Sequence, residues 1–97
     1  MVENESIRHR IFELINAERV RQHEKHGEKN ASLDPFALDY IAFIAEELGE
    51  ASQILQYILN DVSRRDDVTL TDHYISELVQ VAALCVQVIE KIRNNND

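Results

Sequence analysis

The sequence has few residues that interrupt helices or cross-link chains. Its 97 residues include two glycines, one proline, one cysteine and no tryptophan, while 44% are hydrophobic. This composition indicates an ordered globular chain, and the length suits a single domain over residues 1–97. The lone cysteine, Cys85, excludes an internal disulfide. Because it lies in the apolar run VAALCVQVI, we expect a buried thiol in a reducing cytosol.

Long hydrophobic runs and excess positive charge are also missing. The longest apolar run, residues 81–86, is far too short to span a bilayer, and the N-terminus MVENESIRHR lacks the hydrophobic segment of a signal peptide. The formal net charge of −8 disfavours nonspecific binding to nucleic acid or anionic membranes, because an acidic surface repels phosphate. We therefore expect a cytoplasmic protein without nucleic-acid or membrane partners, which would need metal ions to bind a phosphate-bearing ligand.

Apolar periodicity and helix-end signals predict the first two helices. One runs from about residue 5 to 26, with Ile7, Ile11 and Leu14 on one stripe and Gly27 as its C-cap. The next starts at LDPF, where the aspartate (residue 34) can cap the helix and the proline fits its first turn, and it continues to about residue 62.

A third predicted helix begins near TLTDHY, where Thr69 or Thr71 can cap it, and runs to about residue 93, leaving 94–97 as a frayed tail. Alternating strand patterns are absent. We therefore predict an all-α protein with three main helices. Residues 78–89 are apolar almost all round, and so short a chain cannot cover such a helix alone. We expect the chain to complete a four-helix-type bundle through oligomerisation.

The stretch IAEELGEASQ, residues 44–53, places three acids within an apolar helix. At about 100° per residue, Glu47 interrupts the apolar stripe, Glu50 lies at its edge and Glu46 faces outward. In the third helix, Glu77 likewise interrupts an apolar face, and Gln80 follows one turn later in a polar seam. Acids thus face inward on two separate helices.

Inward carboxylates are costly unless they are paired or metal-bound. The spacings Glu47-x-x-Glu50 and Glu77-x-x-Gln80 would bring four oxygen-bearing side chains together on facing helices. Hard oxygen donors favour Mg²⁺ or Mn²⁺ over zinc, and the lack of a Glu-x-x-His pair argues against a di-iron bundle. The alternatives are a solvated acidic face, or salt bridges to basic residues of the first helix: Arg19, Arg21 or Lys25.

Other polar residues are candidates for substrate contact. The face of the first helix that carries the apolar stripe becomes polar toward the C-terminus, where it bears Arg21, Gln22 and Lys25. They could reach phosphate oxygens, or they could form a solvated helix end that suits the helix dipole. Tyr40 could contact a base or sugar or pack in the core. His73 shares the polar seam of Gln80.

The blocks AEELGEASQIL and SELVQVAALCVQVIE, with AERVRQHEKHG upstream, resemble the MazG-like all-α nucleoside triphosphate pyrophosphohydrolases, particularly their short single-domain forms. The resemblance covers roughly residues 17–90. It implies a homodimer or homotetramer that hydrolyses nucleoside or deoxynucleoside triphosphates to monophosphate and pyrophosphate with Mg²⁺, in the house-cleaning of nucleotide pools.

The resemblance also implies residue roles. Glu47, Glu50 and Glu77 match the metal ligands of the family, and Glu46 or Glu50 could assist as the base. The family aspartate falls on Gln80, whose carbonyl can still coordinate Mg²⁺ but brings no negative charge. Two alternatives stay open: a related enzyme acting on phosphoribosyl-ATP, and a noncatalytic helical interaction module, which the glutamine motivates.

Overall fold

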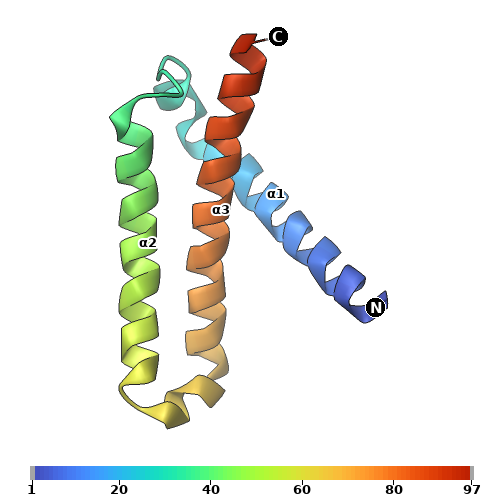
Figure 1. The fold of residues 1–97 in the computed structure, drawn as a ribbon, viewed down its shortest axis with the longest axis vertical. Helices are drawn as coiled ribbons and strands as arrows, with labels where there is room; N and C mark the ends of the chain where they lie inside the picture. Colours follow the sequence, from blue (N-terminus) through green and yellow to red (C-terminus); the bar gives the residue numbers. More distant parts are fainter. Residues whose placement is uncertain (1, 97) are drawn as a thin grey trace.

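The computed structural model describes residues 2–96, most of which lie in three long helices (Figure 1). Helix α1 spans Val2–Asn30, α2 spans Leu38–Leu59 and α3 spans Val68–Asn96, with a short 3-10 helix, η1, at Val62–Asp66. No strand occurs among these residues. The prediction of an all-α chain with three main helices is confirmed.

Helix α3 is the element on which the other two pack. Both α1 and α2 contact α3, but within residues 2–96 they do not pack against each other. The helices α2 and α3 run side by side in opposite directions, joined through η1, whereas the N-terminal half of α1 diverges from them (Figure 1). The resulting shape is open and flat, with extents of 48 × 33 × 20 Å.

The apolar core is small and lies between α2 and α3. Tyr40 is its largest fully buried side chain and packs edge-on against Phe43, with ring centroids 6.1 Å apart. Its hydroxyl accepts a hydrogen bond from Nε2 of Gln87 at 3.5 Å. The other buried apolar side chains in the described part of the chain are Ala51, Ile58 and Ala83. Helix pairing therefore depends on a thin layer of mostly small and medium side chains.

Lys91 of α3 ties the end of α1 to the rest of the fold. Its ammonium donates hydrogen bonds to the backbone carbonyls of Asn30 and Leu33, at 2.5 Å each, and lies 5.4 Å from the centre of the Tyr40 ring. The last carbonyls of a helix have no partner within the helix, so a basic side chain there supplies one. The C-terminus of α1 is thus capped from another helix.

The predicted end of the first helix is wrong for this reason. Helix α1 continues through Gly27 to Asn30, and no glycine of the described residues has a positive φ angle. Gly27 is therefore an interior helix residue rather than a C-cap. The cap comes from Lys91, which follows 61 residues after Asn30 and is not visible in the local sequence.

The predicted caps of the other two helices are also wrong. Asp34 accepts a hydrogen bond from the backbone N–H of Phe36 in a turn ahead of α2, which begins only at Leu38. The carboxylate of Asp67 accepts from the backbone N–H of Leu70 at 3.2 Å and caps α3. Asp67 precedes both predicted capping threonines, and its carboxylate satisfies one of the first free N–H groups of the helix.

The remaining differences concern helix ends and burial. Helix α2 stops at Leu59 rather than near residue 62, and residues 94–96 of the predicted frayed tail are helical, while Asp97 lies outside the described residues. Cys85 is half-buried rather than buried, because α1 and α2 cover α3 on only part of its circumference. Over residues 2–96, no helix has the length and apolarity required to cross a membrane.

Gly49 lies in the interior of α2 with room for a side chain. A Cβ atom added there would meet nothing within 4 Å. We predict that Gly49→Ala raises the free energy of unfolding by about 1 kcal/mol, because alanine loses less conformational freedom in a helix. Urea denaturation followed by circular dichroism measures the change. The matched control is Gly27→Ala, whose Cβ would lie 3.1 Å from two atoms of the His23 ring and which should gain less. A destabilised Gly49→Ala variant would contradict the prediction.

Candidate metal centre

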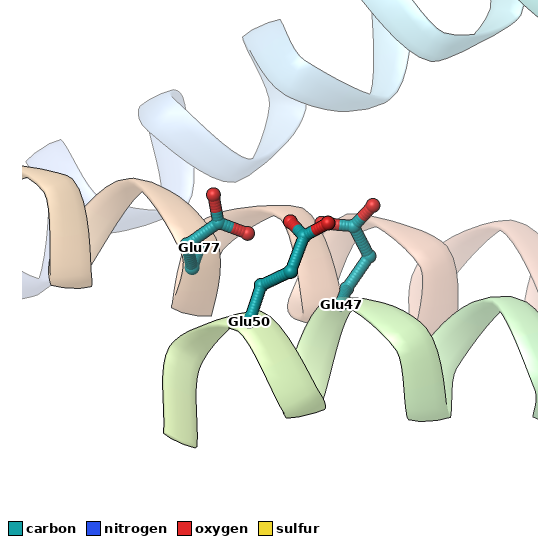
Figure 2. A group of neighbouring side chains, drawn as sticks. All are labelled: Glu47, Glu50 and Glu77. Carbon is teal, nitrogen blue, oxygen red and sulfur yellow. The ribbon is translucent and has the colours of Figure 1, made fainter. Parts of the chain in front are cut away.

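Three carboxylates from α2 and α3 converge between the two helices. Glu47 and Glu50 lie one turn apart on α2 and extend toward α3, which carries Glu77 (Figure 2). One carboxylate oxygen of each residue lies within 4.8 Å of the others. The structure therefore brings together three of the four residues that the spacing placed on facing helices.

The three acids differ in burial. Glu77 is 7% exposed and Glu47 is half-buried, whereas Glu50 is exposed although its carboxylate joins the cluster. The Oε2 atoms of Glu47 and Glu77 are buried and have no hydrogen-bond partner among the described residues. A buried polar group left without a partner costs about 1–3 kcal/mol. These two oxygens are the atoms of the cluster that a bound cation would satisfy.

The surroundings of the acids favour their protonated forms. Burial is the main cause that raises the pKa of Glu47 to about 7, with further contributions from the adjacent side chain of Glu77 and from the charge of Glu50. Burial is also the main cause that raises the pKa of Glu77. Without a cation, these two carboxyl groups therefore hold protons in a pH range where ordinary glutamates are ionised.

Basic side chains of the chain do not neutralise Glu47 or Glu50. Among the described residues, no Lys, Arg or His nitrogen lies within 4.0 Å of either carboxylate. Arg19 is instead paired with Glu90 at 2.8 Å, and Arg21 with Glu18. The salt-bridge alternative therefore does not account for the acids on α2.

Glu77 has one basic neighbour. Nε2 of His73 lies 3.4 Å from Oε1 of Glu77, one turn away on α3. The imidazole is well exposed, and it leaves Oε2 of the glutamate without a partner. His73 thus lies beside the acidic cluster, on the side of α3.

Most other predicted site residues line a cavity next to the acids. It has a volume of about 420 Å³ and lies between the C-terminal half of α1, α2 and α3. Its walls include the predicted residues Arg21, Gln22, Glu46, Glu47 and Gln80. Glu46 is otherwise exposed, in agreement with its predicted outward placement.

Two predicted substrate contacts lie elsewhere. Tyr40 is 1% exposed, so no face of it is open to a base or sugar, and its place is in the core. Lys25 is exposed on α1 and is not among the residues that line the cavity. The polar stripe of α1 therefore divides between residues that face the cavity and residues that face solvent.

The sequence did not identify several residues of the cavity. His26, Lys29 and Asn30 belong to its wall, and so does Gln87, which donates a hydrogen bond to the Tyr40 hydroxyl. Lys29 was missed because the first helix was predicted to end before it. One additional helical turn, stabilised by Lys91, carries its side chain to the cavity.

No protein-family model, curated protein or solved structure matches the chain. The fold and the cluster define a three-helix protein with an acidic centre between two helices.

The pKa of Glu47 predicts how metal-free stability depends on pH. Between pH 4.5 and about 7, the folded chain holds a proton that the unfolded chain has released. The metal-free protein should therefore lose stability as pH rises through this range and level off above it. A Mg²⁺ ion bound by these carboxylates would compete with the proton, so the rise in melting temperature on adding Mg²⁺ should then be larger near pH 8 than near pH 6. Thermal melts at constant ionic strength, with EDTA or with Mg²⁺, measure both effects.

Two variants test the assignment to Glu47. The loss of stability with rising pH should disappear in Glu47→Gln and persist in Glu28→Gln, which changes an exposed glutamate of α1. If Glu47→Gln keeps the pH profile and the Mg²⁺ response of the unmodified chain, the cluster does not bind the ion.

Proposed function

We propose that the protein hydrolyses nucleoside or deoxynucleoside triphosphates to the monophosphate and pyrophosphate in a Mg²⁺-dependent reaction. The observation that carries this proposal is the pair of buried, unpartnered oxygens of Glu47 and Glu77 within a cluster that lacks a neutralising Lys or Arg. A divalent cation would satisfy both oxygens and remove the repulsion. All-oxygen donor sets suit Mg²⁺ and Mn²⁺.

The residues present fit such an ion. Glu47, Glu50 and Glu77 would hold it, and Gln80 at the cavity wall offers a neutral carbonyl oxygen. When bound, Mg²⁺ supplies positive charge to the phosphate oxygens and lowers the pKa of water. Glu46 and Glu50 are exposed carboxylates next to Glu47, and either can accept the proton of the attacking water.

Basic side chains are placed to bind the rest of a polyanion. Arg21, His26 and Lys29 of α1 line the cavity opposite the acidic side chains of α2. Such groups donate charge-assisted hydrogen bonds to phosphate oxygens. His73, at the other end of the cluster, and the exposed Lys25 are further candidates for the same contacts. A chain with a net charge of −8 can thereby hold a triphosphate.

The resemblance to the MazG-like pyrophosphohydrolases supports the same reaction, because the blocks that carry it contain the three clustered acids. In this proposal the enzyme acts in the cytoplasm in the house-cleaning of nucleotide pools. A preference for phosphoribosyl-ATP, or a binding role without turnover, is an alternative outcome of the assay below.

The proposed enzyme is a homo-oligomer in which a second copy covers the apolar surface of α1. The chain exposes 7415 Å², whereas a monomeric globular protein of 11.2 kDa exposes about 5,700 Å². The excess is about 1,700 Å², within the roughly 1,000–2,500 Å² that each subunit of an obligate dimer buries. Three large apolar side chains that are 44–52% exposed share one face of α1: Ile7, Ile11 and Leu14.

Pyrophosphate release tests the proposed reaction. We expect at least one member of a panel of ribo- and deoxyribonucleoside triphosphates and phosphoribosyl-ATP to release pyrophosphate with Mg²⁺, and none to do so with EDTA. Glu47→Gln and Glu77→Gln should lower kcat/KM by about 100-fold or more, because each removes a charged ligand. Glu28→Gln is the matched control and should retain full activity. Full activity of both cluster variants, or no turnover of any panel member by the unmodified chain, would refute the proposal.

Light scattering after size exclusion tests the assembly. The unmodified chain should elute at two or four times 11.2 kDa at micromolar concentration. Ile11→Lys should raise the dissociation constant at least tenfold, because it places a charge in the apolar surface that the partner covers. Leu38→Lys, which changes an 83% exposed residue at the start of α2, is the control and should leave the assembly intact. A monomeric unmodified chain would overturn the homo-oligomer.

A further inference from the structure

Within residues 2–96, helix α3 is covered by the other two long helices on two of its sides. Glu90 pairs with Arg19 of α1, and Gln87 donates to the Tyr40 hydroxyl of α2. A third side of α3 is centred about 120° from Glu90 and about 180° from Gln87, at about 100° per residue. Its side chains are apolar and half-buried or exposed: Leu78, Ala82, Cys85, Ile89 and Ile92.

Helix α2 carries a matching apolar stripe. Phe43 and Glu46 of α2 line the cavity, and the stripe lies about 100–180° around the helix from these two residues. Because α1 and the cavity lie on one side of the paired helices α2 and α3 (Figure 1), the two apolar stripes lie together on the opposite side. We call this surface the outer face, and its main side chains are Ile44, Leu48, Leu55, Leu78, Cys85 and Ile89.

The spacing of the outer face suits a helical partner. Along α3 its residues follow one another alternately four and three positions apart, at 78, 82, 85, 89 and 92. Apolar side chains with this spacing pack as knobs into the holes of another helix. All the side chains of the outer face are uncharged, so a partner of opposite charge finds nothing to pair with there.

The apolar surface of α1 accounts for only a small part of the excess exposed area of about 1,700 Å². Fully burying a large aliphatic side chain removes roughly 60–120 Å² from water. Ile7, Ile11 and Leu14 are already about half-buried, so a partner that covers them and a polar rim buries roughly 300 Å². The area that remains exceeds the roughly 800 Å² that each partner buries in a standard interface.

We infer that the outer face packs against the outer face of a second copy, so that α2 and α3 of two chains form a four-helix layer. A two-fold contact uses the same surface on both chains and therefore needs no second kind of site. Copies with a net charge of −8 repel one another, and an uncharged face is where they can approach at least electrostatic cost.

The contact does not depend on the proposed reaction, and it leaves the cavity open because the cavity lies on the other side of the helix pair. The α1 surface that the proposed enzyme buries is a separate contact. Two different two-fold contacts on one chain generate four copies. We therefore expect a homotetramer rather than a homodimer.

Light scattering after size exclusion tests both contacts. The unmodified chain should have four times the mass of 11.2 kDa at micromolar concentration. Leu48→Lys and Ile89→Lys change side chains that are 53% and 58% exposed, one on each helix of the outer face, and each should halve the mass. Either one combined with Ile11→Lys should give a monomer. Leu38→Lys lies outside the outer face and should keep the tetramer. Circular dichroism checks that each variant keeps its helix content.

The single cysteine reports on the outer face without altering it. Cys85 is half-buried within the chain, and a second copy would cover it further. Alkylation by iodoacetamide should therefore be slow in the unmodified chain and about tenfold or more faster in Leu48→Lys, because thiol reactivity follows exposure. Ile11→Lys and Leu38→Lys leave the outer face paired and should keep the slow rate.

The outcomes separate the two contacts and the reaction. If Leu48→Lys and Ile89→Lys both keep the mass and the alkylation rate of the unmodified chain, or if the unmodified chain is a monomer, the outer-face contact is refuted. If these variants give monomers and Ile11→Lys changes nothing, the outer face is the interface and the α1 surface is not. If they halve the mass while no triphosphate is cleaved, the contact stands and the proposed reaction fails.

Discussion

Repulsion between the carboxylates of α2 and α3 is the constraint that the rest of the site has to satisfy. Two unit charges 4.8 Å apart repel by about 3.5 kcal/mol at an effective dielectric constant of about 20. Within residues 2–96, no Lys or Arg pairs with the three acids, because Arg19 and Arg21 are paired with Glu90 and Glu18, and the only basic neighbour is the exposed His73 beside Glu77. Protons can relieve it at low pH and a divalent ion at high pH. The same centre therefore connects stability with pH and, in the proposed function, with the binding of Mg²⁺.

Helix α1 contributes chemistry rather than core. Its N-terminal half diverges from the helix pair (Figure 1), while its C-terminal half faces the cavity with Arg21, Gln22 and Lys29. The pairing of Arg21 with Glu18 therefore has a second effect beyond neutralisation, since it orients the buried amide next to it. In this arrangement α2 and α3 supply the acids, and α1 supplies the basic groups that line the cavity.

The sequence predicted the parts of this structure that depend on periodicity. Helical repeats place Glu47, Glu50 and Glu77 toward a common face, and the structure brings them together. Helix ends were predicted less well, because they depend on contacts between distant residues. Gly27 was interpreted as a cap because the contact of Lys91 with Asn30 joins residues far apart in the chain.

The cavity could be predicted only in part, for a related reason. Residues of α1 such as Gln22 were recognised as polar interruptions of an apolar stripe, but which of them face the cavity depends on the angle at which α1 crosses α3. Tyr40 shows the opposite error. From the sequence, an aromatic residue near the acids could contact a ligand or pack in the core. The structure shows that Tyr40 packs in the core, against Phe43 and Lys91.

The central position of α3 has a consequence for the order of folding. Helices α1 and α2 are synthesised first, yet each packs on α3 and not on the other. Isolated helices are marginally stable in water, and most of their stability comes from packing of an apolar face. A nascent chain that ends before Val68 thus carries two apolar stripes without their partner. Tertiary structure can form only when α3 has left the ribosome, and until then these stripes are open to chaperones or to a neighbouring nascent chain.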